Sequence, residues 1–403
     1  MVKKNYTLIL FLFLVSYQLF AQQKAGKQPY LIVISLDGFR WDYPEIYHLT
    51  HFDSIAKIGV KANSIQPCFP TVTFPNHYSM ATGLYPENHG IVQNKFYDNA
   101  LKLTYKIGDS KTVMDERFYG GEPIWVTAEK QNLKTASFYW VGSEAPIKGI
   151  HPSFWKLYEN KIPFDQRIDT VIHWLQMPEK ERPHLVMFYL PEPDAISHDY
   201  GPESYETKKM LTYLDSLLWV FVQKLKDLSI GNEINVIITS DHGMSTVSKD
   251  RNIIIDDYLN PLWIKGMYGY NPCYNITAAD NCIDSIYISL KNRPHLKVWK
   301  VKEVPKRLHY NNNQRIADIV VVADSSWSIS RKKDKPPFGG AHGYDNDNMD
   351  MHGIFYAFGP DFKKDYKRKC FNNIQLYVLM SQLLKIKPVP SDGNLKKIND
   401  VLK

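Results

Sequence analysis

The chain has 403 residues, of which 44% are hydrophobic and 23% are charged, proportions typical of a globular protein with one large domain or two smaller ones. The formal net charge is +7 at pH 7, with 49 basic and 42 acidic residues. Such a small positive excess does not favour a nucleic-acid surface, and no binding of nucleic-acid duplexes is expected.

The first 21 residues have the features of an export signal. Lys3 and Lys4 form a charged start, residues 8–15 are an unbroken apolar run, and the segment ends in a small residue. This pattern predicts a signal peptide over residues 1–21, cleaved at its end. An uncleaved membrane anchor is the alternative, but the apolar run is short for a bilayer. The mature chain is expected to be exported to a periplasmic or extracellular space, with no membrane span.

Three short apolar runs follow, at residues 30–36, 185–190 and 234–239. Runs of this length are typical of strands buried on both faces of a parallel sheet. Residues 205–228 carry apolar side chains at three- and four-residue steps, a helical pattern. Strands that alternate with helices predict an α/β sandwich with a mainly parallel central sheet. In such folds the functional residues gather at the carboxyl ends of the strands.

Two later apolar runs, at residues 318–323 and 354–358, are candidates for additional strands. The segment from 245 to about 315 contains many Asn, Pro and Tyr residues, and we interpret it as an insertion over the core. No internal repeat or Gly/Ser-rich linker divides the chain. The sequence therefore predicts one compact catalytic domain over residues 22–403.

Four cysteines allow three pairings if all form disulfides, which an exported protein permits. Cys273 and Cys282 are close enough in sequence to staple one loop, and they are the preferred pair. A bridge between Cys68 and Cys370 would follow only by elimination.

Residues with metal-ligand chemistry follow each of the three main predicted strands: Asp37, then Asp194 and His198, then Asp241 and His242. Taken singly, each also fits a turn, a helix cap or a surface polar pair. Asp194 and His198 are four residues apart, so a helical turn would place them on one face. His342 lies in a polar, Gly-rich loop, where a buried core histidine is not expected.

Jointly these residues supply two clusters of carboxylate and imidazole groups, each with a position left open for substrate. Oxygen and nitrogen donors suit zinc, and an open position is typical of a catalytic metal site. Two metal ions about 4 Å apart can stabilise the attacking and leaving oxygens of a displacement at phosphorus. Thr73, in the turn-like segment 70–77, is then the candidate nucleophile, because metal coordination can activate a hydroxyl group.

The motifs resemble the nucleotide pyrophosphatase/phosphodiesterase family of the alkaline phosphatase superfamily, and the likeness covers most of the mature chain. They are Thr73-Phe74-Pro75-Asn76-His77-Tyr78, Thr82-Gly83-Leu84-Tyr85-Pro86-Glu87-Asn88-His89-Gly90, Asn94, Pro123-Ile124-Trp125-Val126-Thr127, Glu192-Pro193-Asp194, His198, Gly201-Pro202, Ser240-Asp241-His242-Gly243-Met244 and His342-Gly343.

The resemblance implies an alkaline-phosphatase-like fold, two Zn²⁺ ions and a phosphothreonine intermediate. Thr73 would be the covalent nucleophile, and Asn94 would donate to a nonbridging phosphoryl oxygen. The two ligand sets would be Asp194, His198 and His342 for one zinc, and Asp37, Asp241 and His242 with Thr73 for the other. His77 and His89 match motif positions, but we interpret them as structural.

The resemblance also implies a nucleotide substrate. Phe74 and Tyr158 match residues that sandwich the base in nucleotide-cleaving relatives, and Trp140 and Glu144 match residues that line the nucleoside pocket. Val141 stands where Pro often follows that Trp, and Glu144 stands for the usual Asp. The expected reaction releases nucleoside 5′-monophosphates from a small-molecule nucleotide or another phosphodiester.

Other functions remain open at this point. A choline-directed lipid phosphodiesterase shares all the metal ligands. A phosphate monoesterase would need an additional Arg, and none lies in segment 68–89. A sulfatase would need Arg at Val72. A catalytically silent binding protein for nucleotides or glycans is the alternative from another class, although every expected ligand is present.

Overall fold

A computed structural model describes residues 28–403. The predicted signal peptide, residues 1–21, lies outside the described residues. Within residues 28–403, no helix combines the length and the apolar character needed to cross a bilayer.

The described residues form an eight-stranded sheet in the order β19-β2-β18-β9-β1-β8-β6-β7. In the centre, β1 pairs in parallel with both β8 and β9, while β18 is antiparallel to its neighbours. The predicted mainly parallel sheet is therefore confirmed. The strands are β1 (Tyr30–Leu36), β2 (Val60–Ala62), β6 (Thr135–Phe138), β7 (Phe154–Trp155), β8 (Leu185–Leu190), β9 (Ile234–Thr239), β18 (Phe355–Phe358) and β19 (Tyr366–Arg368).

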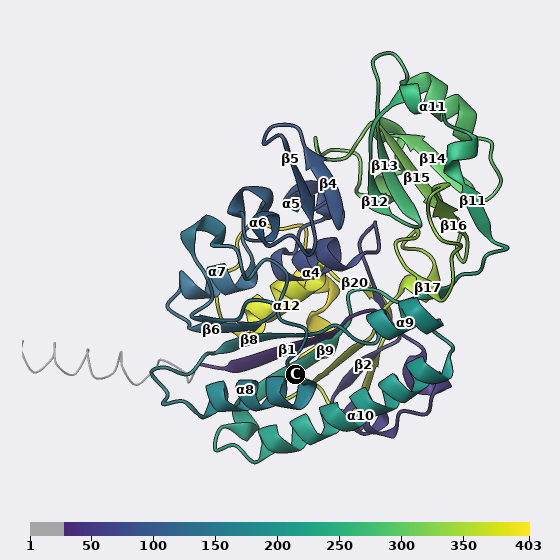
Figure 1. The fold of residues 1–403 in the computed structure, drawn as a ribbon. Coiled ribbons are helices and arrows are strands. Elements are labelled where there is room, and N and C mark those ends of the chain that lie inside the picture. The colour runs from purple at the N-terminus through teal and green to yellow at the C-terminus, as the bar shows by residue number, and fades with distance from the viewer. Residues whose placement is uncertain (1–27) are drawn as a thin grey trace, which may run out of the picture.

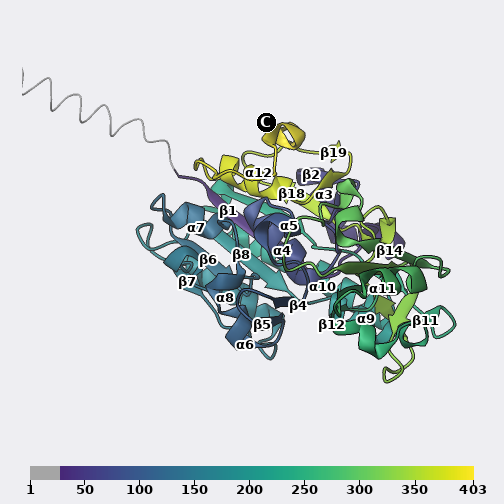
Figure 2. The same cartoon turned by 90° about the horizontal axis from the view of Figure 1, so that it is seen from above.

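Helices cover both faces of this sheet, because alternate residues of its buried strands face opposite sides (Figures 1 and 2). Leu31 and Val33 of β1 pack in one buried cluster with α4 (Thr73–Thr82), α7 (Ile124–Glu129) and α12 (Gln375–Leu383). Ile32 and Ile34 pack in the other with α3 (Thr50–Ile58), α8 (Phe164–Gln176) and α10 (Tyr205–Lys226). The predicted α/β sandwich is thus confirmed.

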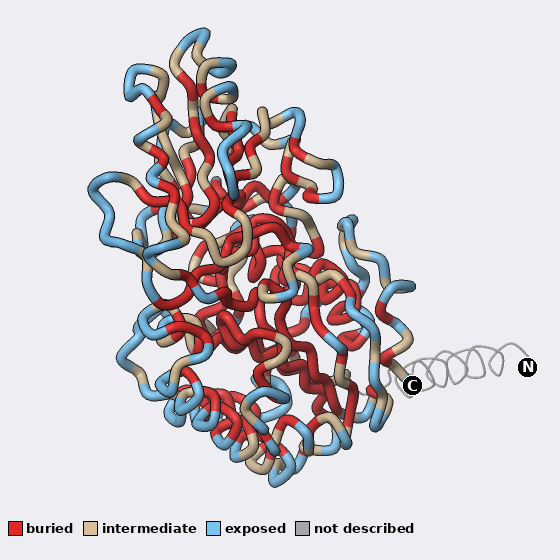
Figure 3. The backbone as a smooth tube through the Cα atoms, turned by 90° about the vertical axis from the view of Figure 1, so that its right-hand side faces the viewer, coloured by how far each residue is buried: buried red, intermediate tan, exposed pale blue. Residues whose placement is uncertain are grey.

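A second sheet of the described chain has four strands in the order β12-β13-β15-β14. It forms a small lobe with its own buried cluster, set apart from the large sheet in Figure 1. The backbone of the large body is more deeply buried than that of the lobe (Figure 3). The lobe consists of β11 (Asn252–Ile254), β12 (Ile264–Tyr270), β13 (Cys273–Ala278), α11 (Ile283–Leu290), β14 (Leu296–Lys300), β15 (Ile319–Ala323) and β16 (Ser328–Ser330).

The lobe follows β9 in the chain and joins the body through a short antiparallel pair, β10 (Ser245–Thr246) with β17 (Gly340–Ala341). The apolar run predicted near residues 318–323 is a strand, β15, and it belongs to the lobe. The run near 354–358 is β18, in the large sheet. The extent of the insertion, 245 to about 315, stays a prediction.

The remaining short elements surround the large sheet or extend from it. They are α2 (Tyr43–Ile46), β3 (Ile65–Gln66), α5 (Pro86–His89), β4 (Lys95–Asp98), β5 (Leu103–Lys106), α6 (Ser110–Val113), α9 (Asp194–Tyr200) and β20 (Phe371–Asn372).

The predicted disulfides are wrong, since all four cysteines are free. Cys273 begins β13 and Cys282 lies beyond the end of that strand. Because a six-residue strand is about 17 Å long, the strand holds the two thiols too far apart for a bridge. Cys68 is buried and contacts Asn373, with Sγ 3.1 Å from Oδ1, whereas Cys370 is exposed beside His352.

Candidate active site

The sheet brings the predicted metal-binding residues together at one edge. Asp37 comes directly after β1, and Asp241 and His242 follow β9, its neighbour. Asp194 begins α9 shortly after β8, the neighbour on the other side. Because the three strands are parallel, their carboxyl ends converge.

A glycine allows the closest approach in this group. Gly38 adopts a φ of +68°, and a Cβ added to it would lie 2.9 Å from the Cβ of Asp194. Its backbone N–H donates to Oδ1 of Asp241 over 3.2 Å. The backbone N–H of Asp194 also donates to the carbonyl of Asp37 over 3.0 Å. A side chain at position 38 would force these strand ends apart.

Asp194, His198 and His342 form one candidate metal-binding group, with their ligand atoms within 4.8 Å of one another. The first two lie on α9, where their four-residue spacing puts them on one face, and His342 follows β17. Nε2 of His198 lies 3.4 Å from Oδ1 of Asp194, and Nε2 of His342 lies 3.5 Å from the same oxygen.

A second group contains Asp37, Asp194 and His242, again within 4.8 Å. Nε2 of His242 lies 3.3 Å from Oδ1 of Asp37 and 3.1 Å from Oδ2 of Asp241. The structure thus brings all six predicted ligands into one place, and Asp194 lies between the two groups.

The three histidines are oriented alike. Nδ1 lies 2.8 Å from the Gly340 carbonyl in His198, 2.9 Å from the Thr71 carbonyl in His342, and 2.8 Å from the Gly243 carbonyl in His242. Each Nδ1–H donates to that carbonyl in the neutral tautomer, which leaves the Nε2 lone pair facing the carboxylates. Such backbone partners are typical of histidines that bind metals.

The burial of the carboxylates and their closeness to one another favour a bound cation. Within the described residues, Oδ1 of Asp37, Oδ1 of Asp194 and Oδ2 of Asp241 are buried without a hydrogen-bond partner. Burial raises the pKa of Asp37 and of Asp241 well above the usual range, and the charge of Asp194 raises both further. A bound cation would offset both effects, because it stabilises the ionised form.

The histidine pKa values fit the same conclusion. Burial lowers the pKa of His342 to about 4, and it lowers the pKa of His242 well below its usual value, with His342 adding to the effect. Neutral imidazoles are the form that binds metals. With carboxylate oxygens and imidazole nitrogens converging, the residues fit a divalent ion that accepts O and N ligands, such as zinc.

Thr73 lies directly beside this cluster. It is the first residue of α4, and its Oγ1 is 3.3 Å from Nε2 of His242. The next backbone N–H, that of Phe74, donates to Oδ1 of Asn94 over 2.9 Å. No described residue accepts a hydrogen bond from the Asn94 amide nitrogen, so this donor remains for another oxygen.

The ring nitrogens of His77 and His89 already have partners within the protein. Nδ1 of His77 lies 3.0 Å from the Thr73 carbonyl and 3.3 Å from Oδ2 of Asp241, and its Nε2 lies 2.9 Å from Oγ of Ser35. His89 uses both nitrogens within the core, where Nδ1 accepts from the Ile91 N–H. These contacts agree with the structural roles that the sequence suggested.

A cavity of about 690 Å³ opens beside Thr73. All four residues predicted to bind substrate line it: Phe74, Trp140, Glu144 and Tyr158. Its walls contain no Lys or Arg among the described residues. Asp37, Thr73 and Asp194 are also part of the lining, so the cavity and the metal-binding groups form one site.

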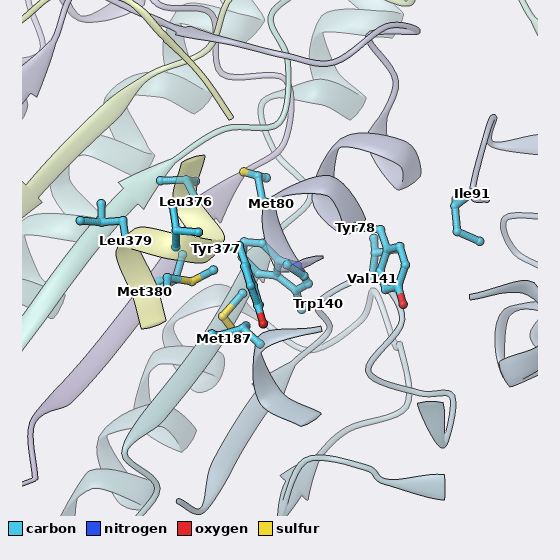
Figure 4. Packing of buried hydrophobic residues seen from close by; sticks show 14 of the residues in the cluster. Tyr78, Met80, Ile91, Trp140, Val141, Met187, Leu376, Tyr377, Leu379 and Met380 are labelled. Carbon is cyan, nitrogen blue, oxygen red and sulfur yellow. The ribbon is translucent and has the colours of Figure 1, made fainter. Parts of the chain in front are cut away.

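The four residues differ in how they face the cavity. Trp140 is 1% exposed, and its Nε1–H donates to the His77 carbonyl over 3.0 Å. It belongs to the buried cluster that contains Met187 and Tyr377 (Figure 4). It therefore supports the cavity mainly from within the core. Tyr158 is 50% exposed, and its backbone N–H donates to Oε1 of Glu144.

Tyr189 is a further residue of the site, one that was not predicted from the sequence. Its hydroxyl donates to Oδ2 of Asp37 over 2.5 Å, and its ring lines the cavity. Tyr189 is the penultimate residue of β8, within an apolar run that we assigned to the core. Its place at the carboxyl end of a buried strand was the available signal. The cavity wall formed by Ile107, Gly108, Ser110, Val113 and Met114, after the β4–β5 hairpin, was also missed.

Known proteins with similar sequences agree with the geometry of this site. Residues 31–345 match the family described as type I phosphodiesterase / nucleotide pyrophosphatase. The chain is 36% identical over 392 residues to ectonucleotide pyrophosphatase/phosphodiesterase family member 1 of Homo sapiens, covering 93% of this chain and 42% of that protein. It is 38% identical over 388 residues to venom phosphodiesterase 2 of Crotalus adamanteus, covering 94% and 48%. The chain thus spans less than half the length of these relatives.

Solved structures agree with the fold. The chain is similar to murine ectonucleotide pyrophosphatase / phosphodiesterase 5, in an inactive variant in complex with AMP, with a TM-score of 0.89 and 34% identity. This similarity covers 94% of the present chain and 100% of the murine one. The human counterpart gives the same TM-score with 35% identity and covers 93% of this chain and 100% of that one.

Proposed function

Because the chain belongs to the type I phosphodiesterase / nucleotide pyrophosphatase family, we propose that it hydrolyses phosphodiester or pyrophosphate bonds of nucleotides and releases nucleoside 5′-monophosphates. One observation carries the proposal. The hydroxyl group of Thr73 lies 3.3 Å from Nε2 of His242, at the point where two carboxylate–histidine groups meet the cavity.

Two Zn²⁺ ions are the proposed cofactors. Asp194, His198 and His342 would hold one, and Asp37, Asp241 and His242 would hold the other with Thr73. When bound, the ions supply positive charge that activates the hydroxyl nucleophile and offsets charge developing on the phosphoryl oxygens. The unpartnered carboxylate oxygens support this assignment.

Thr73 is the proposed covalent nucleophile. Its Oγ1 bonds to phosphorus as the bond to the leaving oxygen breaks, and its proton passes to solvent while the leaving oxygen takes one up. Water then cleaves the phosphothreonine diester and restores the hydroxyl group. The Asn94 amide would donate to a nonbridging phosphoryl oxygen, since Oδ1 already accepts from the Phe74 N–H and holds the amide beside Thr73.

The cavity supports a nucleotide as the substrate. Phe74 and Tyr158 offer aromatic faces for a planar base, while Trp140 and Glu144 complete the lining. The murine relative was solved in complex with AMP. Export to a periplasmic or extracellular space remains part of the proposal, supported by the N-terminal sequence and by relatives named venom phosphodiesterases and ectonucleotide enzymes.

A choline ester is the second candidate substrate. The cavity lining has aromatic rings and Glu144 but no Lys or Arg among the described residues, and such a pocket can accept a quaternary ammonium group. A phosphate monoesterase or a silent binding protein is less well supported.

Turnover of the zinc-loaded protein tests both the reaction and the substrate. We expect hydrolysis of ATP to AMP to be faster than hydrolysis of glycerophosphocholine, measured side by side at equal concentrations. Faster hydrolysis of the choline ester would favour the second candidate. Thr73→Ala should abolish turnover of a chromogenic phosphodiester, and a variant with unchanged turnover would overturn the mechanism.

A further inference from the structure

One wall of the cavity is a loop with no helix or strand of its own. Residues 156–163, here called the 156–163 loop, connect β7 to α8 and have neither element within them. Leu157 and Tyr158 of this loop line the cavity although they are 58% and 50% exposed. An exposed segment without the backbone hydrogen bonds of a helix or sheet needs other contacts to keep a single conformation.

Arg167, near the start of α8, supplies such contacts to the loop. Its side chain is fully buried. Nε donates to the carbonyl of Ile162 over 2.9 Å, and Nη2 donates to the carbonyl of Asn160 over 3.3 Å. Both carbonyls belong to the 156–163 loop, so one guanidinium group fixes its second half.

The burial of Arg167 is unusual because no carboxylate of the described residues forms an ion pair with it. A buried guanidinium group normally pairs with an acid, since its desolvation is costly. Burial also lowers the pKa of Arg167. The contacts that offset this cost come instead from backbone carbonyls and aromatic rings around the guanidinium group.

Tyr139 connects the same guanidinium group to the cavity. The Cζ of Arg167 lies 5.1 Å from the Tyr139 ring centroid, and that ring lies 5.0 Å from the ring of Tyr158. Tyr139 lines the cavity and has a φ of +71°, a conformation that costs a non-glycine residue energy and clusters at functional sites. The cation thus supports both the loop and the strained tyrosine behind it.

We propose that Arg167 is a positioning residue that sets the affinity of the site for the nucleoside part of the substrate, without contacting that substrate. It does so by holding the 156–163 loop and Tyr139 so that Tyr158 presents a fixed ring to the cavity. This inference rests on the proposed function, because it specifies how the same site selects its substrate.

A pair of substrates with one leaving group separates this role from a general loss of activity. The 4-nitrophenyl ester of thymidine 5′-monophosphate places a nucleoside in the cavity, whereas methyl 4-nitrophenyl phosphate places only a methyl group there. Arg167→Met should raise KM for the nucleoside ester roughly tenfold, with little change in kcat. It should leave kcat/KM for the methyl ester unchanged. An equal loss for both esters would overturn the proposal.

Arg182 provides a matched control, since it lies past the other end of α8, outside the cavity lining. Its Nε donates to the carbonyl of Met177 over 3.0 Å, and its Cζ lies 5.6 Å from the Tyr30 ring centroid. Arg182→Met removes the same kinds of contact and should leave both esters unaffected. Arg167→Lys keeps the charge but replaces the forked guanidinium group, whose Nε and Nη2 reach two carbonyls, with a single ammonium nitrogen. It should therefore give an intermediate KM, and it serves if Arg167→Met fails to fold.

Limited proteolysis tests the loop without any turnover. Lys156 and Lys161 are exposed, and trypsin should cut the native Arg167→Met protein after them at least several-fold faster than the parent or Arg182→Met. Equal cleavage rates together with an unchanged KM would overturn the inference. If the parent hydrolyses neither ester, the proposed function fails, while the proteolysis result still decides whether Arg167 holds the loop.

Discussion

The hydroxyl oxygen of Tyr189 lies 2.5 Å from Oδ2 of Asp37. The bond leaves Oδ1 of Asp37 for the cluster, since Oδ2 is already occupied, and it fixes how the carboxylate is turned. Tyr189 is 9% exposed and packs in the core, so Tyr189→Phe removes the hydroxyl group with little loss of packing.

We expect Tyr189→Phe to reduce metal affinity or activity by roughly 10- to 100-fold, as outer partners of metal ligands commonly do. Competition with a chelator for bound zinc measures the affinity directly. Wild-type affinity and kcat in the variant would show that the hydroxyl group does not orient Asp37.

Asn94 has two atoms with different roles, and two substitutions separate them. Asn94→Asp keeps an oxygen to accept from the Phe74 N–H but removes the amide donor. Asn94→Ala removes both. If donation to the phosphoryl group is what matters, both variants should lose about 10²- to 10³-fold in kcat. Steady-state kinetics check this, and near-normal activity of Asn94→Asp would contradict it.

Removing the metals should destabilise the fold as well as stop turnover. Chelation leaves buried carboxylate oxygens of Asp37, Asp194 and Asp241 without a partner. It also removes a ligand that stabilises the folded state by about 4 kcal/mol at a thousand times its Kd. A fall in Tm that added zinc reverses is the expected result.

His198→Ala should lower the metal content from about two ions per chain to about one, as measured by elemental analysis. His295 lies in the lobe, where its ring stacks on Trp327, so His295→Ala is the control and should retain the full content. Full metal content in His198→Ala would contradict the assigned ligand set.

Stability should fall at acid pH because of His89, which burial holds neutral with a pKa of about 3. Between pH 6.5 and 3 the unfolded chain binds a proton that the folded chain excludes, so the free energy of unfolding decreases as the pH falls through this window. The loss from pH 7 to pH 5 is about 2 kcal/mol for one such histidine. Urea unfolding at the two pH values measures it.

His89→Gln should reduce that difference, even if the variant is less stable overall at pH 7. His151 is only part-buried, so His151→Gln is the control and should leave the difference unchanged. A pH dependence that is identical in wild type and His89→Gln would exclude His89 as its source.

The large sheet could be predicted because its central strands are continuous apolar runs, and their order along the chain placed Asp37, Asp194 and Asp241 at neighbouring carboxyl ends. The spacing of Asp194 and His198 fitted a helical turn but left a loop open, and the structure shows a helix, α9. The antiparallel orientation of β18 could not be predicted, because an apolar run has no direction.

Tertiary packing decided the features that the sequence analysis missed. Cys273 and Cys282 are close in sequence, but β13 separates them, and local spacing does not show whether the intervening residues are extended. In the sequence Tyr189 resembles an aromatic core residue, and only the structure shows its hydrogen bond to Asp37. Arg167 is one of three Asp or Arg residues in α8, and only the fold shows that it is buried under a loop.

The pairing of β10 with β17 determines when the site becomes complete. His242 precedes the small lobe in the chain, while His342 follows it, and the carbonyl of Gly340 in β17 accepts the hydrogen bond that orients His198. The ribosome must therefore release about a hundred residues of lobe before the last imidazole reaches its partners. A chain that is cut short within the lobe lacks that imidazole entirely, so the full set of predicted ligands comes together only after the lobe has been made.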